Sequence, residues 1–163
     1  MGISLLNFPE KPGWWNRKVT VIIIISISII LHAWSVWQLP LDFDEPIYLQ
    51  AGNDYADFIK NGDIQTVVAY DQNREHPALV KILYSIPKIL FPDQAYSFYL
   101  FAGRTISAIF GVLAVFITTL INPWAGFLLS LHSMTLKYTS QAYLEAVPLF
   151  AMMMSLYAMF RGK

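Results

Sequence analysis

The chain has 163 residues, no net charge at neutral pH and no cysteine. Hydrophobic residues make up 56% of it and charged residues only 13%, against about 25% charged residues in an ordinary soluble domain. Because the chain has no cysteine, disulfide scaffolds and thiol chemistry are excluded. We find no glycine-rich phosphate loop and no polybasic segment for nucleic acid, so no nucleic-acid partner is expected. The composition predicts an all-α integral membrane protein.

The first predicted transmembrane helix covers residues 19–39. Its apolar part, from Val19 to Trp37, contains no charged residue. At ~1.5 Å per residue it reaches about 28 Å, close to the hydrocarbon thickness of a bilayer. Arg17 and Lys18 precede it, and positive residues beside a span mark the cytoplasmic side. Residues 1–18 are therefore predicted to be cytoplasmic.

Residues 40–97 are predicted to form a large external loop. Nine of the eleven acidic residues lie between positions 42 and 93. Two amphipathic patterns occur within the loop, one from Pro46 to the Asn61-Gly62 turn and one from Pro77 to Leu90. Each pattern is too short and too polar to cross a membrane. Both predict helices that lie along the membrane surface.

The rest of the chain predicts three more transmembrane helices, at residues 98–121, 124–138 and 142–160, followed by a cytoplasmic end at 161–163. Four crossings return the C-terminus to the cytoplasm, in agreement with the basic residues Arg161 and Lys163. The third span is short, because Trp124 to Leu136 reaches only about 20 Å. A re-entrant hairpin remains the alternative there.

Asp44 and Glu45 follow the first span directly and carry the main functional hypothesis. One interpretation is structural, because an acidic residue before proline caps a helix and complements its positive end. The other is catalytic, because a carboxylate held at a membrane boundary can act as general base. Adjacent carboxylates also raise one another's proton affinity.

The chain has three histidines that are candidate functional groups. His76 precedes the second surface helix, where it either caps that helix or contributes to a divalent metal or phosphate site near Asp44 and Glu45. His32 and His132 lie inside predicted spans, where packed and hydrogen-bonded histidines are expected.

Arg104 and Glu145 are the charges that are most costly to place in a membrane, because a charge at bilayer centre costs at least about 2.5–3.5 kcal/mol. Both lie near the outer ends of their predicted spans. Snorkelling to the interface is an alternative for Arg104 and less so for the shorter Glu145. Together with Asp44 and His76, they are expected to converge on the outer membrane face.

The order of these motifs resembles the amino-terminal part of the GT-C superfamily of polyprenyl-phosphate-sugar glycosyltransferases, in the protein O-mannosyltransferase and lipid A aminoarabinose transferase branch. Asp44-Glu45 matches the acidic pair of the first external loop. Residues 76–81 (HPALVK) resemble His-Pro-Pro-Leu-x-Lys, and residues 104–111 (RTISAIFG) resemble Arg-Leu-Pro-Ser-Ala-Leu-x-Gly. Residues 140–145 (SQAYLE) loosely resemble Ser-Arg-x-Ala-Leu-Leu-Asp.

The resemblance implies transfer of a sugar from a polyprenyl-phosphate donor to an acceptor on the outer face, with inversion at the anomeric carbon. Asp44 and Glu45 would be catalytic, with Asp44 as the base. A divalent metal ion is an optional cofactor. The substrate-binding residues would be His76, Lys81, Arg104 and Glu145, and the metal ligands would be Glu45 and His76.

Members of this superfamily carry a seven-helix module, so the chain resembles only its front half. The expected partners are a membrane lipid carrier and further transmembrane helices, from the remainder of the protein or from a second chain. Alone, the chain is not expected to be active. The alternative hypothesis is a noncatalytic membrane subunit of the same fold, which binds lipid phosphate or a partner helix bundle.

Overall fold

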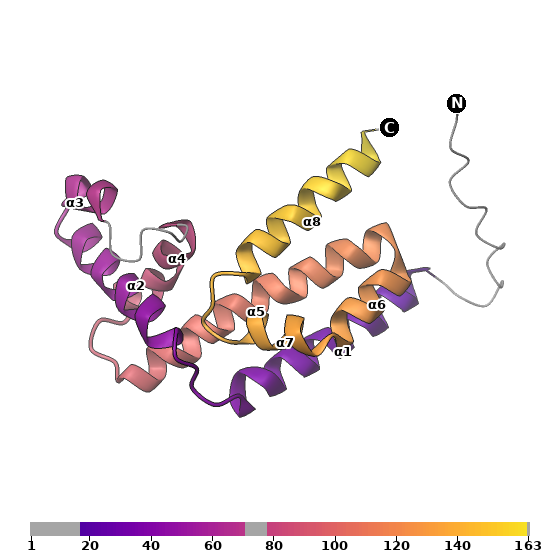
Figure 1. Ribbon diagram of the computed structural model, residues 1–163, viewed down its shortest axis with the longest axis horizontal. Helices are drawn as coiled ribbons and strands as arrows, with labels where there is room; N and C mark the ends of the chain where they lie inside the picture. The colour runs from indigo at the N-terminus through magenta and orange to yellow at the C-terminus, as the bar shows by residue number, and fades with distance from the viewer. Residues whose placement is uncertain (1–16, 71–77, 163) are drawn as a thin grey trace.

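The computed structural model describes residues 17–70 and 78–162. In this part of the chain every regular element is a helix, which confirms the all-α prediction. Helices α1, α5, α6 and α8 run along the long axis of the molecule, and α2, α3 and α4 lie at the end opposite the C-terminus (Figure 1). The helices are α1 (Arg17–Gln38), α2 (Glu45–Lys60), α3 (Ile64–Ala69), α4 (Ala78–Leu90), α5 (Tyr96–Ile121), α6 (Pro123–Leu131), α7 (Ser133–Ser140) and α8 (Ala146–Arg161).

Helices α1 and α5 form the centre of the bundle and run antiparallel. The guanidinium of Arg17 donates to the carbonyl of Leu120 at 2.8 Å, and Arg104 donates to the carbonyl of Val36 at the other end. Both helices are long and apolar enough to cross a membrane, with 22 and 26 residues. The structure therefore agrees with two of the four predicted transmembrane helices in length and composition.

The third predicted span, residues 124–138, is not a single helix. It consists of α6 and α7, which are separated at His132, a residue with the non-helical backbone angles φ −70° and ψ 113°. The imidazole Nδ1 of His132 accepts the backbone N–H of Thr135 at 3.2 Å and so caps the start of α7. Side-chain capping explains why a new helix begins at this position. His132 is also exposed rather than packed as expected.

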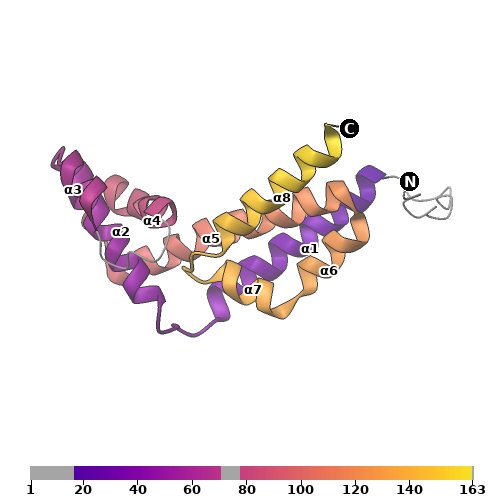
Figure 2. The ribbon, with the colours of Figure 1, turned by 45° about the horizontal axis from the view of Figure 1, so that its top comes forward.

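The fourth predicted span begins later than expected. Residues 141–145 form an irregular segment, and α8 has 16 residues, which reach about 24 Å. It packs along α5 (Figure 2), and the rings of Phe110 on α5 and Phe150 on α8 have centroids 5.6 Å apart. Four membrane-length helices are therefore not confirmed in the described residues.

The two predicted surface helices correspond to α2 and α4, and they pack against each other. Gly52 permits this contact, because a Cβ there would lie 2.9 Å from the Tyr84 Cβ. A buried apolar cluster joins α2 and α4 to the segment before α8; it consists of Tyr48, Leu49, Val80, Tyr84, Ala142, Tyr143 and Leu144. The short helix α3 was not predicted, and the Asp63 carboxylate caps it by accepting the Thr66 N–H. The packed pair of α2 and α4 thus holds the start of α2 against the bundle.

Candidate functional site

The end of α1, the start of α2, the middle of α5 and the segment before α8 meet around one ion pair. Arg104 on α5 binds Glu45 in a bidentate manner, with Nε–Oε1 at 2.8 Å and Nη2–Oε2 at 2.7 Å. Both side chains are buried, Glu45 completely and Arg104 with 4% exposed. Two residues 59 positions apart in the sequence are thus joined inside the protein.

Every N–H group of Arg104 has an acceptor. Besides the two bonds to Glu45, Nη1 donates to the carbonyls of Val36 and Leu39, at 3.1 and 2.7 Å. Nη2 also donates to the carbonyl of Pro40 at 2.9 Å. A guanidinium has five N–H donors; three bind the carbonyls where α1 ends, and two bind Glu45 at the start of α2. In this geometry none is available for a phosphate.

The carboxylate of Glu45 is equally saturated. Oε1 accepts the N–H of Ala142 at 2.8 Å in addition to Arg104, and Oε2 accepts the N–H of Asp42 at 3.0 Å. A carboxylate offers about four lone-pair positions, and four donors occupy them here. Glu45 therefore does not fit the role of a metal ligand. Among the described residues, no group of three or more acidic or histidine side chains is placed to hold a metal ion.

Asp42 belongs to a second polar cluster, which lies nearer to the surface. Its carboxylate pairs with Lys137 on α7 at 3.0 Å, accepts the backbone N–H of Phe43 at 2.7 Å, and also accepts a hydrogen bond from the hydroxyl of Tyr143. The Lys137 ammonium, followed by the Tyr143 hydroxyl, lowers the pKa of Asp42 below its usual value. The charge of Asp42 is thus already balanced by the protein.

Asp44 lies in the sequence between Asp42 and Glu45, and unlike their side chains its own is not bound by a described cation. Its backbone begins α2, because its carbonyl accepts the N–H groups of Ile47 and Tyr48, each at 3.1 Å. Its side chain makes no capping hydrogen bond, and it has no hydrogen bond or ion pair with the residues that the structure describes. The side-chain capping interpretation therefore lacks its hydrogen bond, and no described residue uses either carboxylate oxygen of this half-buried residue.

The other predicted site residues are more scattered. His76 lies outside the described residues. Lys81 is buried on α4, with 2% of its surface exposed. Glu145 is exposed immediately before α8. His32 is buried and hydrogen-bonded as expected, with Nε2 2.9 Å from the Thr139 hydroxyl and Nδ1 2.8 Å from the carbonyl of Ser28.

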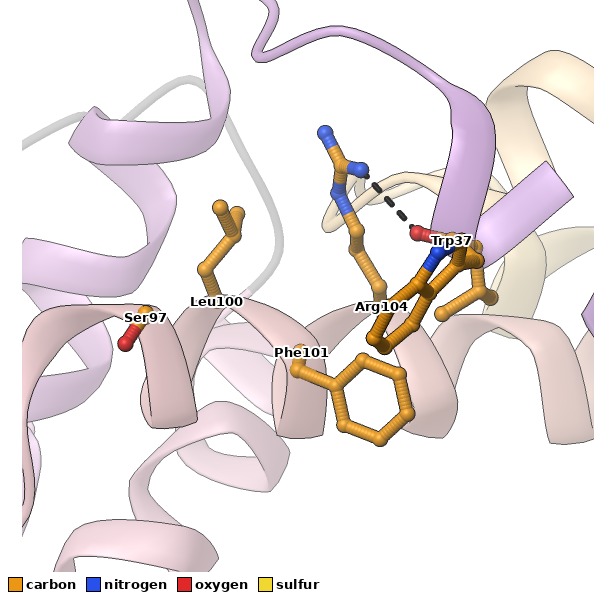
Figure 3. A pocket seen from close by; sticks show the side chains of 6 residues that line it. Trp37, Ser97, Leu100, Phe101 and Arg104 are labelled. Atoms are coloured by element: carbon orange, nitrogen blue, oxygen red, sulfur yellow. Dashed lines mark hydrogen bonds between the residues drawn. The ribbon is translucent and has the colours of Figure 1, made fainter.

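A pocket of about 280 Å³ opens beside Arg104, between the end of α1 and the start of α5. Figure 3 shows the rings of Trp37 and Phe101 next to each other along one side, with centroids 6.1 Å apart. The other lining residues are Val36, Ser97 and Leu100. Because the donors of Arg104 are already used, this mainly apolar pocket suits a hydrocarbon chain better than an anion.

Lys137 and Tyr143 were not among the predicted site residues. Lys137 carried a usable signal, because it is a lone charge inside the predicted third span and such charges are usually paired. Tyr143 carried none, since tyrosine is common at membrane boundaries. Both residues reach Asp42 because α7 packs against α1. The sequence pattern did not indicate this packing.

The lowered pKa of Asp42 predicts an acid-dependent contribution to stability. A carboxyl group whose pKa is lower in the folded state stabilises the fold above its unfolded value of about 3.9, and this contribution is lost as the pH falls through the folded pKa. We therefore expect the thermal midpoint in detergent to fall more steeply below about pH 4 in the wild type than in Asp42→Asn. Lys137→Gln should flatten the curve in the same way. Parallel curves for all three proteins would contradict this assignment.

Comparisons with protein-family models, with curated proteins and with solved structures find no match to this chain. The glycosyltransferase hypothesis accordingly rests on the motifs of the sequence and on the geometry described above.

Proposed function

We propose that the chain is a membrane glycosyltransferase, or the front half of one, which moves a sugar from a polyprenyl-phosphate carrier to an acceptor on the outer membrane face. The observation that carries this proposal is the contrast among three neighbouring carboxylates. Asp42 is neutralised by Lys137 and Glu45 by Arg104. Asp44, between them, has no partner among the described residues. A carboxylate whose oxygens are not used by the neighbouring described residues is suited to accept a proton from a substrate.

In the proposed reaction, an Asp44 carboxylate oxygen takes the proton of the acceptor group while the acceptor atom attacks the anomeric carbon of the sugar. The bond between that carbon and the phosphate oxygen breaks, and the phosphate leaves with the bonding electrons. The configuration at the anomeric carbon is inverted. The leaving group is already a stable anion, so it needs positive charge rather than a general acid. No step uses a metal ion.

The saturated contacts of Arg104 and Glu45 give these residues a positioning role in this proposal. Together they fix the backbone before Asp44, through Pro40 and Asp42, and they tie the segment before α8 to it through Ala142. Lys81 is buried, so positive charge for the leaving phosphate would come from outside the described residues. His76 and Glu145 remain candidates for contacts with the substrate.

The second candidate function is a noncatalytic membrane subunit that binds lipid or a partner helix bundle. The apolar pocket beside Trp37 and Phe101 favours this alternative, because it offers lipid contact without any chemistry. The two functions differ in one result: replacing Asp44 by asparagine lowers sugar transfer in the complete assembly by roughly two orders of magnitude or more in the first, and leaves it unchanged in the second.

The proposed location can be tested separately from the chemistry. The chain has no cysteine, so single cysteines can be introduced at Gln65, exposed on α3, and at Gly162, after α8. An impermeant thiol reagent applied outside intact cells should label the cysteine at position 65 and leave the one at position 162 unlabelled. Labelling in the reverse pattern would contradict the proposed orientation and the external site with it.

A further inference from the structure

The break between α6 and α7 lies beside the interior of α5 rather than at one of its ends. Gly126 of α6 packs against Thr119, and Thr139 of α7 packs against Gly111. The break at His132 is therefore placed between the levels of Thr119 and Gly111, which are about 12 Å apart along the helix. If α5 crosses the membrane, the break lies within the hydrocarbon region.

The break is exposed on the surface of the described structure. Leu131, His132, Ser133 and Met134 are all exposed, and we call these four residues the break patch. The end of one helix and the start of the next leave backbone N–H and C=O groups without helical partners. Hydrocarbon offers no hydrogen bonds, so non-helical backbone is tolerated at this depth only where protein or water covers it.

His132 defines the chemistry that a partner must supply. Its Nδ1 accepts the backbone N–H of Thr135 at 3.2 Å, so in the neutral ring the hydrogen is on Nε2. The Thr135 hydroxyl lies 2.9 Å from the same Nδ1. Nε2–H is therefore a donor on the surface, and no acceptor for it is present among the described residues.

We propose that the break patch is covered by a transmembrane helix from outside these 163 residues, and that this helix presents an amide or carboxylate oxygen to His132 Nε2–H. A second copy of the chain matches less well. Its long apolar helices, at residues 19–37, 97–121 and 146–160, offer side-chain hydroxyls but contain no Asp, Glu, Asn or Gln, and so no amide or carboxylate oxygen. The inference rests on the proposed membrane location and is independent of the sugar-transfer reaction.

Site-specific photo-crosslinking in native membranes tests this inference. A benzophenone amino acid is placed at Ser133 in the break patch or, as a matched control, at Ile30, which is exposed on α1 at a similar depth. We expect Ser133 to form an adduct with another protein segment, and peptide mapping should place the adduct on an apolar helix that contains Asn, Gln, Asp or Glu. Ile30 should form adducts with lipid alone.

The substitution His132→Leu, combined with the probe at Ser133, supplies the second readout. Loss of the Nε2–H donor should lower the adduct yield several-fold, whereas His132→Gln, which retains an N–H donor, should retain more of it. The proposal would be overturned by lipid adducts alone at Ser133, by an adduct between two copies of the chain, or by a yield that does not depend on residue 132. If the complete assembly forms the adduct at Ser133 but transfers no sugar, that result counts against the proposed function and leaves this inference standing.

Discussion

Replacing Glu45 with glutamine is expected to destabilise the protein by about 3–5 kcal/mol, because breaking a buried pair leaves an uncompensated charge. The charge left behind is Arg104, which is 4% exposed and donates both Nε and Nη2 to this carboxylate. Glutamine preserves the shape but offers one acceptor oxygen in place of two. The expected result is a large drop in the thermal midpoint in detergent and in the amount of folded protein recovered.

Glu145→Gln is the matched control, because it makes the same chemical change at an exposed carboxylate. Surface substitutions of this kind usually stay within about 0.5 kcal/mol. Arg104→Lys should behave like Glu45→Gln, since an ammonium has three donors and cannot replace five. If Glu45→Gln is as mild as Glu145→Gln, the ion pair does not hold the end of α1 as described.

Asp44→Asn is expected to reduce sugar transfer in the complete assembly by roughly two orders of magnitude or more, because general-base catalysis contributes about 10²–10⁴ in rate. The amount of folded protein should not change. The Asp44 side chain makes no hydrogen bond or ion pair with the described residues, so its amide loses no structural contact. Activity per folded molecule therefore separates the catalytic role from a structural one.

Asp57→Asn provides the comparison for this variant. Asp57 lies on the same helix and its carboxylate pairs with Lys88 at 2.7 Å, at a half-exposed position where ion pairs are worth little. We expect normal transfer from it. Equal and mild losses for Asp44→Asn and Asp57→Asn would show that Asp44 has no special role.

The hydrophobic pattern of the sequence was sufficient to predict the helices that are defined by a long apolar run or by amphipathic spacing. An uncharged run from Val19 to Trp37 can only be buried or lie in lipid, and it forms α1. The amphipathic spacing after Pro46 likewise predicted α2 to within one residue at its start. The sequence pattern did not predict the break at His132. Hydrophobicity averaged over an apolar stretch does not reveal a single side chain that caps a new helix.

The candidate site was predictable in its residue types but not in its pairing. Arg104 and Glu45 were both singled out, and the cost of a charge in a membrane indicates that such residues need partners. The sequence alone assigned Arg104 to substrate and Glu45 to catalysis or metal, whereas the structure joins the two to each other. Which of the three carboxylates has no partner among the described residues depends on tertiary contacts, including that of Lys137 with Asp42.

Complementation of the isolated chain is the most direct test of the proposed function. The purified 163-residue chain, given a polyprenyl-phosphate sugar and an acceptor, should bind lipid weakly and transfer no measurable sugar. Positioning of the reactants can supply about 7–11 kcal/mol of a barrier, and in this proposal further transmembrane helices provide part of the wall that positions them. Adding the remaining helices in trans should produce turnover that is lost in Asp44→Asn. Normal turnover by the isolated chain, or restored turnover that does not depend on Asp44, would contradict this account.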